Sequence, residues 1–168
     1  MASDLPALWK SVLDRVNADT GSGGLRNVTT PLITGVYNTR PPFTAEGSDP
    51  FPYLVYSVFE SENRNAFRTR VWRRRVRFDI FVQVDPNGTL DVLQRGADIL
   101  RRVEGDWEDQ AVGTAPTFGF DRFQPTLTSS GWTAGIFDLV DSGEDHSPED
   151  ELYTWTMTFD ILTSKAGA

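Results

Sequence analysis

Carboxylates gather in one short stretch of the chain, residues 141–151, which also contains the single histidine, His146. Its acidic residues are Asp141, Glu144, Asp145, Glu149, Asp150 and Glu151. Oxygen ligands of this kind could hold a hard cation such as calcium or magnesium. Two of the carboxylates could instead act as an acid–base pair on a glycoside, or His146 could act as a catalytic base.

None of these three chemistries has the spacing that it requires. A calcium loop needs a fixed register of ligands, and glycosidase carboxylates must flank a cleft on rigid elements. A histidine among acidic neighbours on an exposed loop needs no catalytic role to explain it. We therefore expect 141–151 to be the acidic tip of a hairpin, solvated or facing a partner or a lumen.

Composition narrows the chemistry further. The chain has 168 residues, no cysteine and one histidine, which leaves no thiolate nucleophile, no disulfide and no multi-histidine metal site. The glycine-rich segment 19–24 is followed by Leu25 and Arg26, where a phosphate-binding loop needs a Lys-Ser/Thr pair. Residues 85–88 indicate a turn, because the closing glutamate of a calcium loop is missing. The sequence predicts neither an enzyme nor a cofactor or metal site.

A row of arginines lies on a predicted strand over residues 68–84. The even positions are largely apolar, namely Trp72, Val76, Phe78, Ile80, Val82 and Val84. Arg73, Arg75 and Arg77 therefore share the other face, with neighbouring arginines about 7 Å apart. Like charges at this spacing repel one another unless carboxylates or water compensate them. Three interpretations remain open: a solvated face, an interface with another subunit or a tube, and a nucleic-acid stripe.

Charge is unevenly distributed along the chain. The net charge of −8 divides into −3 for residues 1–63, +5 for 64–104 and −10 for 105–168. The overall acidity argues against a dedicated nucleic-acid binder, because phosphate contacts need a basic excess. A basic middle and an acidic end suit either ordinary solubility or head-to-tail pairing between copies.

The periodicity of apolar residues predicts one α+β domain over residues 1–168, with a mainly antiparallel sheet flanked by two helices. We expect helices over about 4–18, capped by Ser3, and from a cap at Thr89 to near Gly105. The predicted strands cover residues 31–37, 53–59, 68–84, 118–128, 131–140 and 153–161. The proline-containing segment 38–52 is predicted to be a mobile loop. The apolar runs are too short for a membrane span and the start lacks a signal segment, so we expect synthesis in the cytosol.

The order and spacing of these elements resemble a known family over about residues 4–104. They combine an amphipathic helix, a short strand ending in Val36-Tyr37, a proline-containing loop into 52–56, the long strand with 75–82 and a helix directly after it. This pattern resembles the tail terminator, or tail completion, proteins of long-tailed bacteriophages. The C-terminal third departs from the pattern, because 105–130 and 141–151 are longer than it requires.

The resemblance implies a structural role without catalysis. Such a protein would form a homohexameric ring on the last ring of the tail tube protein, end tube growth and offer a surface to the head–tail connector or stopper. DNA would only pass through, and the protein would reside in the virion neck or tail after assembly in the host cytoplasm. Another neck or minor tail protein is the nearest alternative, and a soluble ligand-binding or enzymatic α+β domain is a more distant one.

Overall fold

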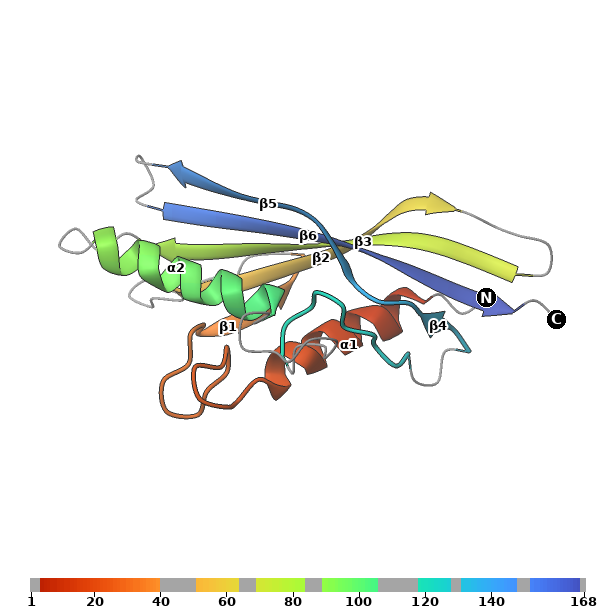
Figure 1. Ribbon diagram of the computed structural model, residues 1–168, viewed down its shortest axis with the longest axis horizontal. Helices are drawn as coiled ribbons and strands as arrows, with labels where there is room; N and C mark the ends of the chain where they lie inside the picture. The colour runs from red at the N-terminus through yellow and green to blue at the C-terminus, as the bar shows by residue number, and fades with distance from the viewer. Residues whose placement is uncertain are drawn as a thin grey trace.

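The computed structural model describes residues 4–39, 51–63, 69–83, 89–105, 118–127, 131–147 and 152–166. Two helices and six strands lie in these ranges (Figure 1). The helices are α1 (Leu5–Ala18) and α2 (Thr89–Glu104). The strands are β1 (Gly35–Asn38), β2 (Tyr53–Asn63), β3 (Thr69–Gln83), β4 (Thr133–Ala134), β5 (Asp138–Ser147) and β6 (Leu152–Ala166).

The strands form one six-stranded sheet in the order β1-β2-β3-β6-β4, with β5 also paired to β6. Only the β1–β2 pair is parallel among these pairings. β3 and β6 are both 15 residues long and pair from Thr69 with Ala166 to Gln83 with Leu152. About half of the residues in each strand are β-branched, threonine included, or aromatic, and these side chains suit a long pleated surface. The predicted α+β class with a mainly antiparallel sheet is confirmed.

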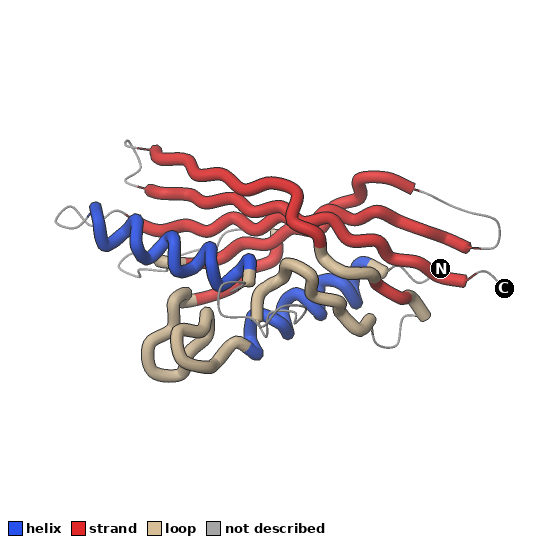
Figure 2. Tube along the Cα trace, in the orientation of Figure 1, coloured by secondary structure: helices blue, strands red, loops and turns tan. Residues whose placement is uncertain are grey.

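Both helices lie on the same side of the sheet (Figure 2). Val76, Phe78 and Ile80 of β3 are fully buried on the face that the helices cover. α1 adds Leu8, Val12 and Val16 to the same core, at the spacing of one helix face. The opposite face of the sheet carries the odd positions of β3, and we call it the outer face. Because side chains alternate between the two faces of a strand, the odd positions of β3 point away from the helices.

α2 packs closely on β6 through a glycine. A Cβ atom on Gly96 would lie 2.3 Å from the Trp155 ring, so the helix reaches this position only without a side chain there. Trp155 is 3% exposed beneath it. The apolar residues Val92, Ile99 and Val103 complete the buried face of α2. The predicted second helix is confirmed, but Thr89, predicted as its cap, is instead its first residue.

The prediction of a strand over 118–128 is wrong for the described residues 118–127, which form turns and irregular structure. The backbone N–H of Phe120 donates to the Val103 carbonyl at the end of α2, and that of Arg122 donates to the Phe137 carbonyl. Gly119 and Arg122 have φ angles of +79° and +64°, which strand backbone does not adopt. The apolar residues of this segment instead pack against the core, and Phe120 is only 1% exposed.

Three other boundaries differ from the predictions. The strand predicted over 31–37 begins only at Gly35, and the one predicted over 131–140 divides into β4 and the start of β5. Gly135 separates them by donating its N–H to the Leu162 carbonyl. Asp4, rather than Ser3, occupies the N-cap position of α1, and its side chain makes no capping hydrogen bond.

The predicted acidic hairpin tip is also wrong over residues 141–147, because these residues belong to β5. They pair with residues 152–158 of β6, and the ladder hydrogen bonds override the turn preference of the glycine, serine and aspartate residues. A bulge between Leu139 and Asp141 resets the register. Of the predicted loop 38–52, residues 40–50 lie outside the described part of the chain, so its mobility stays a prediction.

Candidate interaction surface

Strand alternation places Arg73, Arg75 and Arg77 together on the outer face, as the sequence predicts. Their side chains are 36%, 34% and 49% exposed. Asp160 of β6 lies directly opposite Arg75 in the antiparallel register. The long β3–β6 pairing thus supplies the carboxylate that this row of like charges requires.

Asp160 bridges two of the three arginines. Its carboxylate accepts a hydrogen bond from Nη2 of Arg73, and another from Nε of Arg75 at 2.9 Å. Burial alone would raise the pKa of Asp160, but the hydrogen bonds and charges of Arg75 and Arg73 outweigh it and lower the pKa. The same hydrogen bond raises the pKa of Arg75. The cluster holds two cations and one anion.

Arg77 pairs within its own strand. Its Nε donates to Oδ1 of Asp79 at 2.9 Å, and the Thr156 hydroxyl donates to the same oxygen at 3.1 Å. Every arginine of the predicted row therefore has a carboxylate partner inside the chain. The row is an ion-paired surface rather than a bare basic stripe.

Large apolar side chains accompany these ion pairs. Phe59, opposite Arg75, is 43% exposed, and Leu162, opposite Arg73, is 47% exposed. Leu162 also borders a hollow of about 380 Å³. It is lined by Arg73, Arg122, Gly135, Ile136, Asp138, Asp160, Ile161 and Leu162. Exposed apolar groups next to arginines form a surface with the chemistry of protein–protein contacts.

The acidic residues predicted at a hairpin tip lie elsewhere or outside the described residues. Asp141, Glu144 and Asp145 are exposed on β5. Within the described part of the chain none of the three has an ion-pair partner. Glu149, Asp150 and Glu151 fall outside the described ranges. The structure brings none of the described acids, Asp141, Glu144 and Asp145, to Arg73, Arg75 or Arg77.

Sequence reasoning missed a buried ion pair beside this surface. Arg74 is 4% exposed on the helix-covered face, where its Nε and Nη2 donate to the Asp4 carboxylate at 2.9 and 2.6 Å. The Thr163 hydroxyl donates to the same carboxylate at 2.5 Å. The signal was an arginine at an even position of the apolar series, because a charge on that face requires a buried partner.

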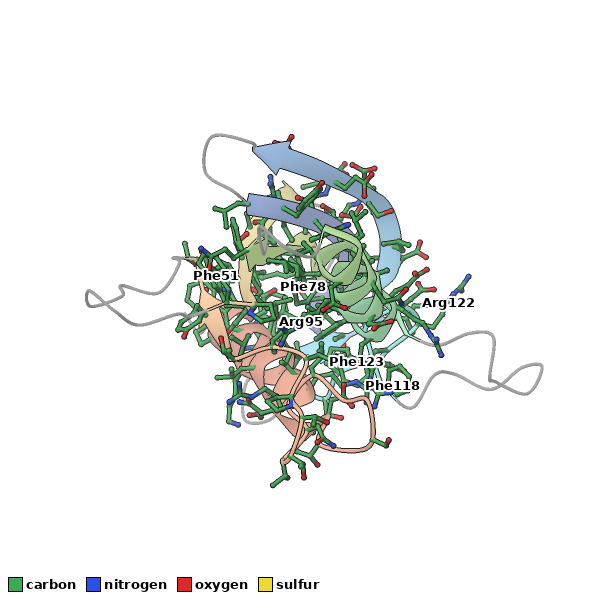
Figure 3. The ribbon with its side chains drawn as sticks, turned by 90° about the vertical axis from the view of Figure 1, so that its left-hand side faces the viewer. Phe51, Phe78, Arg95, Phe118, Arg122 and Phe123 are labelled. Atoms are coloured by element: carbon green, nitrogen blue, oxygen red, sulfur yellow. The ribbon has the colours of Figure 1, made fainter. Side chains whose placement is uncertain are left out.

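A second ion pair that the sequence did not indicate joins the two helices. Arg102 of α2 donates to both carboxylate oxygens of Asp19, at 2.8 and 2.5 Å, and its guanidinium lies 3.3 Å from the centre of the Phe118 ring. The Arg15 guanidinium lies 4.2 Å from the Phe123 ring centre. Figure 3 shows both phenylalanines on one side of the molecule, with Arg122 extending outward near them. These contacts hold 118–123 against the helices.

The described residues contain no group of three or more histidine, aspartate and glutamate side chains arranged to hold a metal ion. Within the same residues, no helix has both the length and the apolar character that crossing a membrane requires.

Comparisons with known proteins bear on the fold. No protein-family model matches the chain, and no curated protein resembles its sequence. Among solved structures, the fold is similar to that of a chain in the virion of a native gene transfer agent particle. The TM-score is 0.63 at 10% identity, and the match covers 96% of this chain and 98% of the other. At that identity the likeness shows a shared fold.

Proposed function

We propose that this protein is a structural component of a phage-like virion. The observation that carries the proposal is the fold shared over nearly the whole length of both chains with a chain of a gene transfer agent virion. Because the match covers 96% of this chain and 98% of the other, we infer a common architectural role by analogy between the two folds. The outer face supports it, because exposed apolar and arginine side chains suit contacts with other proteins.

Within the virion, we propose that the chain is the tail terminator. In this role copies of the chain form a ring, expected to be a hexamer, on the last ring of the tail tube. The ring stops addition of tube protein and presents a surface to the head–tail connector, while DNA passes through without specific contacts. The family resemblance of residues 4–104 supports this finer assignment, and a single domain over 1–168 is consistent with it.

Tube length is the decisive test of termination. Purified chain is added to tail tube protein during polymerisation, and the tubes are measured by negative-stain electron microscopy. A terminator shortens the tubes in proportion to its concentration and appears as an extra ring at one end. Tubes of unchanged length with the chain bound to connector rings would instead assign it to another neck position.

The outer face is proposed to take part in ring formation. Arg75→Glu places two carboxylates opposite each other across β3 and β6, which weakens a contact through this face. We expect the variant to fold, with unchanged circular dichroism, and to lose its place at tube ends. Arg95→Glu on the exposed side of α2 is the matched control. Equal binding by both variants would remove the arginine row from the interface.

A further inference from the structure

We propose that the hollow beside Arg122 receives the acidic end of β5 from a second copy of this chain, in a head-to-tail contact. The hollow is the 380 Å³ depression between β6 and the segment from β4 to β5. The acidic end is the part of β5 around Glu144 and Asp145. The assignment deepens the proposed function, on which it rests for its place in a ring.

The hollow has the composition of a docking site. Ile136 and Leu162, which line it, are 40% and 47% exposed, so a partner would remove apolar surface from water there. Its volume is enough for one or two side chains. Arg73 is already engaged with Asp160, and Arg75 binds the same carboxylate. Asp160 is therefore neutralised and does not repel an incoming acid.

Arg122 is the cation that this hollow offers to a partner. Its backbone is fixed in the left-handed region at φ +64° by the N–H bond to the Phe137 carbonyl. Its side chain is exposed and extends away from the body of the molecule (Figure 3). Among the described residues it has no acidic partner.

Two further cations lie beyond the hollow toward the end of β6, on the helix-covered face of the sheet. Arg70 and Lys165 face each other directly across β3 and β6, a repulsive arrangement that a nearby acid would relieve. Neither has an ion-pair partner within the described ranges. Asp138 is the one lining carboxylate of the hollow that makes no ion pair there. Around the hollow, Arg73, Arg75 and Arg122 therefore stand against Asp138 and Asp160, and this excess of one positive charge favours an acidic occupant.

The acidic end of β5 supplies that charge from the other extremity of the molecule. β5 runs away from β4 toward the start of β6, so Glu144 and Asp145 lie at the opposite end of the sheet from Arg70 and Lys165 (Figure 1). Asp145 pairs with Thr154, eight residues before Leu162, which is about 26 Å along β6. One molecule therefore cannot satisfy both ends by itself.

Two different, complementary patches on one chain define a heterologous contact. Repeated by rotation, such a contact closes into a ring or continues as a helix. A self-paired contact would need one patch that is complementary to itself, whereas the acidic end would repel its own copy. The occupant that fits the charge and the position is thus a neighbouring copy.

Disulfide crosslinking between introduced cysteines can test this contact directly, because the chain has no cysteine of its own. Gly135 lines the hollow and Gly143 precedes Glu144, and a Cβ at either position meets no atom closer than 3.6 Å. A mixture of Gly135→Cys and Gly143→Cys chains is oxidised and the disulfide dimer is quantified on a gel. Gly21→Cys mixed with Gly143→Cys is the control, since Gly21 also lies in open space.

We expect the Gly135→Cys and Gly143→Cys mixture to form about tenfold more dimer than the control mixture, a difference of about 1.4 kcal/mol. Each variant alone should form no more dimer than the control. Adding Arg122→Glu to the Gly135→Cys chain should remove the excess, and adding Glu144→Lys and Asp145→Lys to its partner should restore it. No excess dimer, equal self-pairing of Gly135→Cys, or no restoration would each overturn the proposal.

This experiment separates the contact from termination. Dimers without tube shortening would leave the contact standing and remove the proposed function. Tube shortening without mixed dimers would retain the function and reject this pair of surfaces.

Discussion

Three consecutive arginines of β3 make ion pairs in two different environments. Arg74 lies on the helix-covered face and is 4% exposed, with Asp4 fully buried beside it. Arg73 and Arg75 lie on the outer face, where their side chains are about one-third exposed and share Asp160. The chemistry of guanidinium and carboxylate is the same, and only the parity of the residue differs.

The two environments give the ion pairs different consequences. Water screens charges on the outer face and can replace a lost partner, so an exposed pair adds little to stability. A buried carboxylate left without its partner keeps its full desolvation cost. The Asp4–Arg74 pair therefore joins the start of α1 to the sheet, whereas the outer pairs leave arginines available for contacts between molecules.

The largest effect is expected from Arg74→Ala. Loss of the guanidinium leaves the Asp4 carboxylate buried, which should lower the free energy of unfolding by about 3–5 kcal/mol. Urea denaturation of Arg74→Ala, Asp4→Ala and the double variant measures this and the coupling between the two residues. If the double variant loses the sum of the two single effects, the residues do not act as a pair.

The second-largest effect is expected from acid, which should reduce the stability that the Asp4–Arg74 pair contributes. Burial raises the pKa of Asp4, but the hydrogen bonds from Arg74 and Thr163 and the charge of Arg74 outweigh it, so the pKa lies below its ordinary value of 3.8. The stability that Asp4 contributes is therefore complete above that value and disappears as the pH falls through the lowered pKa. Unfolding of the wild-type chain and Asp4→Asn, compared between about pH 5 and pH 2, checks this: the difference between them should shrink with acid.

Asp160→Asn tests the outer pair by the same logic. The variant leaves Arg73 and Arg75 side by side without their shared anion, but both reach water. We expect a loss of about 1 kcal/mol or less in the free energy of unfolding, reduced further by added salt. A loss as large as that of Arg74→Ala would show that the outer face is covered in solution.

The smallest effect is expected from Arg77→Ala. The Arg77 side chain is 49% exposed, and Asp79 retains the hydrogen bond from Thr156. The free energy of unfolding should change by no more than about 0.5 kcal/mol. Thermal unfolding against the wild-type chain is sufficient to measure it, and a larger change would place Arg77 with the structural arginines.

Local periodicity was enough to predict much of the architecture. The period of two in residues 68–84 and 153–161 identified the central pair β3 and β6, and it placed Arg73, Arg75 and Arg77 on one face. The helical spacing of apolar residues identified α1 and α2. These patterns succeed because a residue's face within an element depends only on its neighbours in sequence.

Ion-pair and strand partners that are distant in sequence could not be predicted from such local patterns. Asp160, which pairs with Arg75, and Asp4, which pairs with Arg74, are 85 and 70 residues away. The acidic residues 141–147 have the composition of a turn but become a strand because β6 offers them an unpaired edge. Residues 118–127 have the composition of a strand but pack as turns because α2 and Phe137 satisfy their backbone groups.

The sequence by itself determined the two helices, the long central strands and their faces, and the absence of cysteine chemistry, since these depend on composition and on neighbouring residues. Only the tertiary structure decided which arginine is buried, which carboxylate pairs with each arginine, and that the hollow lies about 26 Å along β6 from the acidic end of β5. The physical reason is that burial and charge pairing are properties of the assembled sheet, in which residues far apart in the chain come into contact.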